Sequence, residues 1–185
     1  MNESKIGKRY AKALFDFAIE QNKLEQVIKD MDLVNNTIQQ SRELKTLLKN
    51  PVMHNKKKKT IVKALFEKHI GEIVLNYLMI IVSKNRGRYI FDIAAQFVVY
   101  YKKYKNIKTA HLATAQKVND EIRQTIIQTL EEQTKATVEL EEDLNEDLIG
   151  GMVLKVDDLE IDMSLRKRIN ELSQKFKTNI YQGKY

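Results

Sequence analysis

The chain has 185 residues, of which 43% are apolar, so it can bury one large hydrophobic core or two small ones. It contains no cysteine, which excludes disulfides, thiolate metal sites and a cysteine nucleophile. The net charge of +7 is uneven, because residues 1–105 hold 21 Lys and Arg against 10 Asp and Glu, whereas residues 106–185 hold 11 against 15. This asymmetry predicts two modules that face different partners.

Helical periodicity dominates the first hundred residues, where apolar side chains recur at intervals of three and four. The first helix has an apolar stripe wider than a single core contact needs. A second helix is expected over residues 24–40, and a third begins at the capping Ser41 and ends at Asn50, which precedes a proline. A fourth begins at Asn55. The fifth and sixth are expected over residues 72–84 and about residues 89–105. The connections between them are short. The pattern therefore predicts a six-helix bundle over residues 1–105.

The pattern changes at Asn106, where we place the domain boundary. Residues 107–118 are rich in Thr, Ala and Val and predict the first strand. Asn119 is expected to cap a helix, whose buried stripe is predicted to be Ile122, Ile126 and Leu130. A second strand is expected over residues 137–140, followed by an acidic segment over residues 141–147.

The adjacent glycines Gly150 and Gly151 precede an alternating apolar run, the pair Asp157-Asp158 and a second short run. This order predicts a β-hairpin with an acidic two-residue turn. Ser164 is placed to cap a final helix. Its apolar residues Leu165, Ile169, Leu172 and Phe176 stand at offsets of four, seven and eleven. The predicted fold is mainly α, with an N-terminal six-helix bundle and a small α+β module with a β-hairpin over residues 106–185.

A catalytic reading finds little support in the residues. The histidines His54, His69 and His111 lie far apart and show no ligand spacing. The Asp157-Asp158 pair is typical of a hairpin turn, and the glycine pair lacks the pattern of a phosphate loop. We therefore expect a protein that is not an enzyme, with no catalytic, cofactor-binding or metal residues and no cofactor.

The chief alternative is a basic helical protein that binds nucleic acid. The run Lys56-Lys57-Lys58-Lys59 and the nearby tyrosines Tyr100, Tyr101 and Tyr104 offer phosphate contacts and stacking partners. A solvated helix face is the favoured interpretation, because no nucleic-acid-binding motif accompanies these residues. A membrane-surface role for the basic helices is a further alternative. The nearly apolar run at residues 73–82 is too short to span a bilayer.

Two distant segments carry a resemblance to a known family. The first runs from Lys8 to Phe15 (KRYAKALF), and the second runs from Leu148 to Arg168, with its glycine pair, hairpin and basic helix. Residues 48–52 and 76–88 match between them in order and spacing. The chain thus resembles, over essentially its whole length, the delta subunit of F-type ATP synthase, the family of the oligomycin-sensitivity-conferring protein. It departs at Met163, where the family commonly has glycine, and in the loop at residues 85–88.

The resemblance implies a non-catalytic stator subunit of a proton-translocating ATP synthase. Such a subunit links the catalytic head to the b subunit of the peripheral stalk and resists the torque of the rotor. It is a monomer within a hetero-oligomeric complex and is not inserted in the membrane. Because the chain starts at Met1 without an Arg- and Ser-rich presequence, we expect it at the cytoplasmic face of a bacterial inner membrane.

The resemblance also assigns a partner to each module. The bundle is expected to bind the N-terminal helix of an alpha subunit in a groove between its first and fifth helices. The groove residues predicted from the excess of apolar side chains are Tyr10, Ala13, Leu14, Phe17, Tyr77, Leu78 and Ile81. Core packing is the alternative role for each of them. The second module is expected to bind the b subunit, with Gly150, Gly151, Leu165 and Ile169 on the stalk side.

Overall fold

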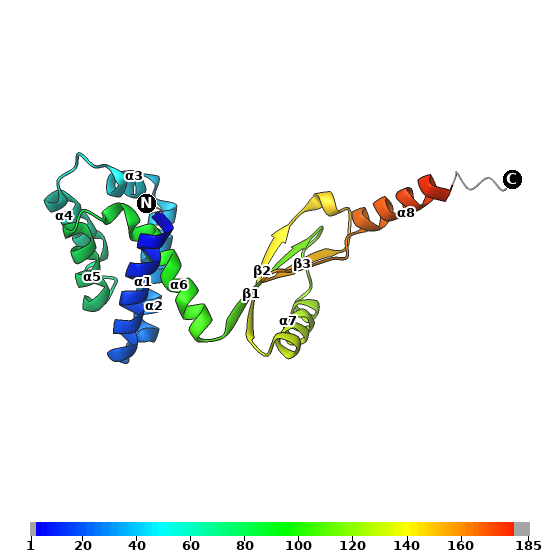
Figure 1. Cartoon of the computed structure of the whole chain (residues 1–185), viewed down its shortest axis with the longest axis horizontal. Helices are drawn as coiled ribbons and strands as arrows, with labels where there is room; N and C mark the ends of the chain where they lie inside the picture. Colours follow the sequence, from blue (N-terminus) through cyan, green and yellow to red (C-terminus); the bar gives the residue numbers. More distant parts are fainter. Residues whose placement is uncertain (1–2, 180–185) are drawn as a thin grey trace. The chain divides into compact units, whose positions relative to one another are not determined.

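The computed structural model describes residues 3–179 and divides after Lys105 into two compact units (Figure 1). We call them unit 1, which ends at Lys105, and unit 2, which begins at Asn106. Unit 1 contains α1 (Glu3–Glu20), α2 (Leu24–Gln40), α3 (Arg42–Lys49), α4 (Asn55–Phe66), α5 (Glu72–Ser83), a short 3-10 turn η1 (Gly87–Tyr89) and α6 (Ile90–Tyr104). The mainly α fold with an α+β C-terminal part and a β-hairpin is confirmed.

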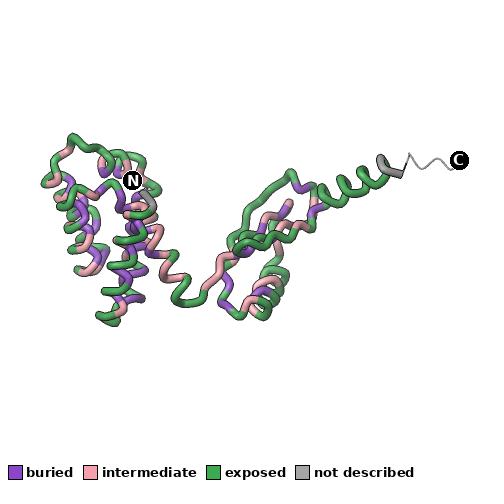
Figure 2. Tube along the Cα trace, in the orientation of Figure 1, coloured by how far each residue is buried: buried purple, intermediate pink, exposed green. Residues whose placement is uncertain are grey.

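The core of unit 1 forms where α1 and α2 pack along α6, and where α4 packs along α5. Met31, Phe66 and Phe97 are among its largest fully buried side chains. The ring of Phe15 meets that of Phe97 edge to face, with 5.8 Å between their centroids, a preferred aromatic geometry. Figure 2 shows the buried residues of unit 1 distributed over all of its helices.

The ends of these helices follow local capping rules. The hydroxyl of Ser41 accepts a hydrogen bond of 3.2 Å from the backbone N–H of Leu44, as expected for an N-cap. Asn22 and Asn85 follow α1 and α5 with φ values of 53° and 62°, in the left-handed region that asparagine tolerates better than most residues. α1 and α5 therefore end where an asparagine suited to the turn is available.

Lys58 has a structural role that the sequence pattern of four consecutive lysines does not indicate. Its side chain is buried, and its Nζ donates hydrogen bonds to the carbonyls of Leu48 at 3.1 Å and Asn50 at 2.7 Å. These carbonyls belong to the C-terminal end of α3, whose last carbonyls have no partner within the helix. Burial lowers the pKa of Lys58 below its ordinary value. One of the four consecutive lysines therefore stabilises the turn between α3 and α4.

Unit 2 is built on a four-stranded sheet. Its elements are β1 (Ile107–Thr114), α7 (Asp120–Thr134), β2 (Thr137–Leu144), a 3-10 turn η2 (Glu146–Leu148), β3 (Met152–Val156), β4 (Leu159–Asp162) and α8 (Leu165–Asn179). The strand order is β2-β1-β3-β4. β1 and β2 are parallel and joined through α7, whereas β3 pairs antiparallel with both β1 and β4. Asp157 and Asp158 form the hairpin turn.

A small core lies on the face of the sheet that α7 covers. Leu130 from α7 is buried with Leu112 of β1, Val138 of β2 and Leu154 of β3. Leu154 stands opposite Ile161 of β4, but Ile161 is exposed, so the apolar surface of this face extends beyond the core. α7 therefore leaves Ile161 of β4 uncovered on this face.

Three details differ from the sequence expectations. The first strand ends at Thr114 rather than at residue 118. At this end the Thr114 hydroxyl donates a hydrogen bond to the backbone carbonyl of Gln116. The second strand continues through the acidic residues 141–144, because they pair with β1 along its whole length. Ile122 is 53% exposed rather than buried, since the first turn of α7 borders an open cleft.

We expect Lys58→Ala to lower the free energy of unfolding by about 1 to 3 kcal/mol, because two carbonyls at the C-terminal end of α3 lose their donor and one of them is buried. Lys58→Met keeps most of the buried stem and isolates the loss of these hydrogen bonds. The measurement is urea unfolding followed by circular dichroism. The exposed Lys57→Ala is the matched control and should change the free energy by no more than about 0.5 kcal/mol. Equal effects of K57A and K58A would contradict the assignment.

Candidate functional site

A first candidate surface lies where α1 and α5 face each other. The Tyr77 hydroxyl on α5 donates a hydrogen bond of 2.8 Å to the backbone carbonyl of Tyr10 on α1. The Arg86 guanidinium lies over the Tyr10 ring at 4.9 Å from its centroid. Burial raises the pKa of the Tyr77 hydroxyl above its ordinary value. These contacts bring the flanks of the two helices together.

The structure divides the seven predicted groove residues between core and surface. Leu14, Leu78 and Ile81 are at most 2% exposed and belong to the core, so their side chains offer no surface to a partner. Tyr10 and Tyr77 are half-buried, whereas Ala13 and Phe17 are exposed. Phe17 leaves 45% of its surface in water, which is unusual for a large aromatic residue without a partner.

Three apolar residues on the same flanks are absent from the predicted set of groove residues. Ile6 extends the α1 flank, and Ile73 and Ile80 extend the α5 flank around Tyr77. Ile80 is 54% exposed. The available signal was the spacing of four and three residues through Ile73, Tyr77 and Ile80, one step away from the buried stripe. We define the α1/α5 surface as Ile6, Tyr10, Ala13, Phe17, Ile73, Tyr77 and Ile80.

The glycine pair positions the beginning of α8 in unit 2. Gly151 has a φ of +78°, and a Cβ atom there would stand 2.3 Å from the carbonyl oxygen of Met163. The carbonyl of Gly150 accepts a hydrogen bond from the N–H of Leu165 at 2.9 Å, and that of Met152 accepts one from Met163 at 2.8 Å. Glycine is required at residue 151 because its backbone passes against another backbone.

A cap fixes the same junction from the other side. The Ser164 hydroxyl accepts a hydrogen bond of 3.2 Å from the N–H of Lys167, as predicted for the cap of the last helix. The Asp162 carboxylate accepts one of 2.8 Å from the N–H of Ser164, and this backbone donor lowers the pKa of Asp162. Ser164 is itself buried. The hairpin and the first turn of α8 are therefore held as one joint.

Beyond this joint, α8 presents an uncovered apolar stripe. Every described side chain of α8, from Leu165 to Phe176, is exposed (Figure 2). The stripe consists of Leu165, Ile169, Leu172 and Phe176, whose exposed fractions range from 43% to 69%. Spacings of three and four residues place these side chains along one side of the helix. A stripe of this kind is typical of a helix that packs against a partner. Both predicted stalk-side residues on α8, Leu165 and Ile169, belong to it.

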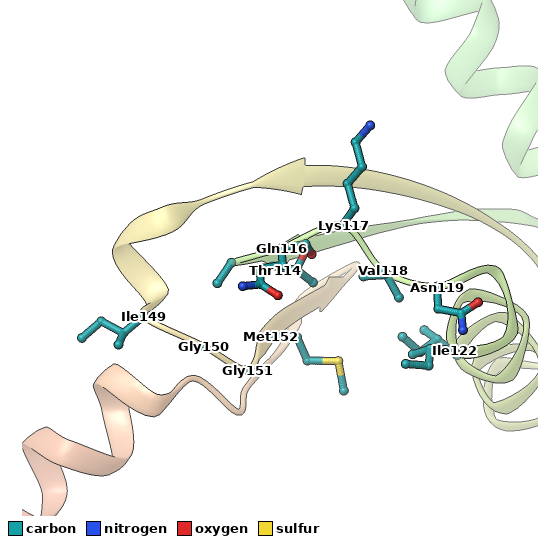
Figure 3. Close-up of a pocket in the computed structure, with 12 residues that line it drawn as sticks. Thr114, Gln116, Lys117, Val118, Asn119, Ile122, Ile149, Gly150, Gly151 and Met152 are labelled. Carbon is teal, nitrogen blue, oxygen red and sulfur yellow. The ribbon is translucent and has the colours of Figure 1, made fainter.

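A cleft of about 550 Å³ opens beside the glycine pair (Figure 3). Gly150 and Gly151 line it together with the apolar side chains of Val118, Ile122 and Met152. Ile149, which precedes the glycines, has a φ of +64° and is exposed. A β-branched residue in this region is strained, so the turn into β3 is held by its surroundings.

The described residues contain no group of three or more His, Cys, Asp or Glu side chains that could hold a metal ion. Nδ1 of His111 lies 3.2 Å from a carboxylate oxygen of Glu141, but both side chains are more than half exposed on adjacent strands. Such an exposed pair on a sheet surface has a small energetic effect. We identify no catalytic constellation around any of the histidines.

The residues behind the nucleic-acid alternative have other contacts. Lys58 is buried in the α3–α4 turn. The Tyr101 hydroxyl donates a hydrogen bond of 2.8 Å to the Glu25 carboxylate, and the Tyr104 ring meets that of Phe15 edge to face. Tyr101 and Tyr104 therefore support the contacts of α6 with α2 and α1, rather than forming a stacking platform.

None of the helices in residues 3–179 is both long enough and apolar enough to cross a membrane.

Comparisons with known proteins agree across the whole chain. The model of the family described as "ATP synthase delta (OSCP) subunit" matches residues 6–176. The ATP synthase subunit delta of Cytophaga hutchinsonii is 31% identical over 176 residues, which cover 95% of this chain and 96% of the relative. That of Christiangramia forsetii is 29% identical over 184 residues and covers both chains fully. The chloroplastic subunit of Galdieria sulphuraria is 30% identical, covering 91% of this chain and 96% of its own.

The fold has a solved counterpart. A chain in the mitochondrial ATP synthase hexamer of Toxoplasma gondii superposes with a TM-score of 0.71 at 24% sequence identity. The match covers 92% of this chain and 96% of the other. At this identity the likeness establishes a shared fold.

We expect Gly151→Ala to destabilise unit 2 by about 1 to 3 kcal/mol, because the added Cβ meets a backbone carbonyl in a left-handed conformation. Gly150→Ala is the matched control. Its Cβ would meet only the flexible side chain of Leu165, so the loss should be smaller. Hydrogen exchange of the α8 amides, measured together with thermal unfolding, tests the difference. Equal tolerance of both substitutions would exclude the proposed joint.

Proposed function

The chain belongs to the ATP synthase delta (OSCP) subunit family, and from this membership we propose that it connects the catalytic head of a proton-translocating ATP synthase to the peripheral stalk. The observation that supports the connector role most directly is that each unit has its own uncovered apolar helix surface. Unit 1 has the α1/α5 surface, and unit 2 has the α8 stripe. A connector needs two separate interfaces of this kind and no catalytic group.

We propose that the α1/α5 surface binds the N-terminal helix of an alpha subunit. An amphipathic helix binds between two helices by inserting apolar side chains at intervals of three and four residues. The exposed Phe17 and Ile80 would contribute most of the apolar area that a partner buries, because the core residues beneath them are already covered. Tyr10 and Tyr77 would form the floor, held by the hydrogen bond from the Tyr77 hydroxyl to the backbone carbonyl of Tyr10.

We propose that the α8 stripe binds the b subunit of the peripheral stalk. Offsets of four, seven and eleven residues are those of a helix that packs along another helix. The adjacent Arg166, Lys167 and Arg168 are exposed, so a partner helix with acidic residues beside its apolar seam would fit best. The joint at Gly151 and Ser164 would transmit the load from α8 into the sheet.

The mechanical consequence follows from these two attachments. If one unit holds the head and the other holds the stalk, the head cannot turn with the rotor, and the torque goes into catalysis. The subunit itself then needs no catalytic residue. In a bacterial cell it would lie at the cytoplasmic face of the inner membrane, held there through the complex, as one copy in a hetero-oligomer.

Ile80→Asp is expected to weaken binding of an alpha-subunit N-terminal peptide by at least about tenfold, because it places a charge in the apolar contact. Val99→Asp is the matched control. Val99 is also a helical residue that is 54% exposed, but it lies on α6. Titration calorimetry gives the affinities, and thermal unfolding verifies that both variants are folded. An unchanged affinity of I80D would exclude this binding surface.

Ile169→Asp should abolish most of the recovery of b subunit in a pull-down with the full chain, while recovery of the alpha subunit persists. The reason is that Ile169 lies in the middle of the α8 stripe and far from the α1/α5 surface in sequence. Leu144→Asp, at an exposed position of β2, is the control for an added charge in unit 2. If I169D retained the b subunit, or lost both partners, the two-surface connector would be refuted.

A further inference from the structure

A hollow in unit 1 is lined by none of the α1/α5 surface residues and is surrounded by positively charged side chains. It measures about 380 Å³ and is lined by Lys45 and Lys49 of α3, Arg88 of η1, and Phe91 and Asp92 of α6. Lys45 and Lys49 are one helical turn apart, so they share one side of α3. Three cations from two different elements thus surround one space.

Aromatic rings hold two of these cations in place. Nζ of Lys45 lies 4.6 Å from the centroid of the Phe91 ring, and the guanidinium of Arg88 lies 4.6 Å from that of Tyr89. Arg88 also donates a hydrogen bond to the Tyr89 hydroxyl. Cation–π contacts restrict the side chains without neutralising their charge. The positive groups are therefore partly ordered before any ligand arrives.

Carboxylates do not balance this charge. In the part of the chain that the structure describes, neither lysine nor Arg88 forms an ion pair, whereas Lys63 pairs with Glu67 and Lys105 with Glu25. Asp92 is the single acidic residue in the lining of the hollow, and it has another interaction of its own. Three like charges around a concave space produce a local positive potential that a bound anion relieves.

We propose that this hollow binds an oxyanion of the phosphate class, either free phosphate or the terminal phosphate of a nucleotide. A tetrahedral anion offers oxygens in several directions, which suits cations that approach from α3 on one side and η1 on the other. Arginine binds such oxygens with two parallel donors, and lysine adds point charges. The site uses none of the residues of the α1/α5 surface or of the α8 stripe, so its failure would leave the connector function intact.

The test is an NMR titration of the full 15N-labelled chain with orthophosphate, pyrophosphate and ATP at constant ionic strength. We expect saturable shifts of the amides of Lys45, Arg88 and Phe91, with the same amides responding to all three ligands. Binding should tighten from orthophosphate to pyrophosphate as the charge rises. A response to ATP alone would identify the terminal phosphate of a nucleotide as the ligand. A response at the amides of Lys56 to Lys59 instead, or no saturable response to any of the three, would overturn the assignment.

Substitutions distinguish binding in the hollow from non-specific attraction of an anion to a basic protein. Lys45→Gln and Arg88→Gln should each weaken pyrophosphate binding by about fivefold, because each removes one charge-assisted contact at a partly solvated site. Lys68→Gln changes the net charge equally but lies outside the hollow, so binding should be unchanged. Equal weakening by all three variants would reject the site. Thermal unfolding of each variant verifies that it is folded.

Discussion

The close passage of the Gly151 backbone against the carbonyl of Met163 determines where α8 can begin. A side chain at residue 151 would occupy the space of that carbonyl, so the two backbone segments could not keep their hydrogen bonds. The same approach places Ser164 where its hydroxyl caps the helix. From that point the helix leaves the core of unit 2, and its apolar stripe stays in water. The position of the exposed α8 stripe thus depends on the close backbone contact between Gly151 and Met163.

Local chemistry explains why much of the fold could be predicted from the sequence. The bounds of α2, the caps at Ser41, Asn119 and Ser164, and the hairpin turn at Asp157-Asp158 depend on residues within one or two turns. The parallel pairing of β1 with β2 depends on contacts between distant segments, so the strand order was not predictable. For the same reason, the second strand was expected to end at residue 140, whereas the acidic residues 141–144 continue it at the edge of the sheet.

For the candidate surface on unit 1, the sequence predicted which helices carry apolar stripes but not which of their side chains are buried. Helical periodicity located the apolar stripes of α1 and α5, and the resemblance to a family paired the two helices. The boundary between core and surface depends on how neighbouring helices pack, which the sequence does not contain. Leu78 and Ile81 are therefore covered, whereas Ile80, between them in the sequence, points outward. The hydrogen bond from the Tyr77 hydroxyl on α5 to the backbone carbonyl of Tyr10 on α1 likewise joins residues 67 positions apart.

The α1/α5 surface and the α8 stripe, which we propose as docking surfaces, lie outside cores that are complete without them. Unit 1 buries its own cluster around Phe66 and Phe97, and unit 2 buries a separate one around Leu112 and Leu130. Because Phe17, Ile80 and Ile169 lie outside these clusters, their burial by a partner would add free energy to binding rather than to folding. Each unit can therefore fold around its own core before assembly, and the apolar side chains that remain exposed are available to be buried on binding. The connector role proposed above would need this separation, because a core shared with one partner would weaken when that partner dissociates.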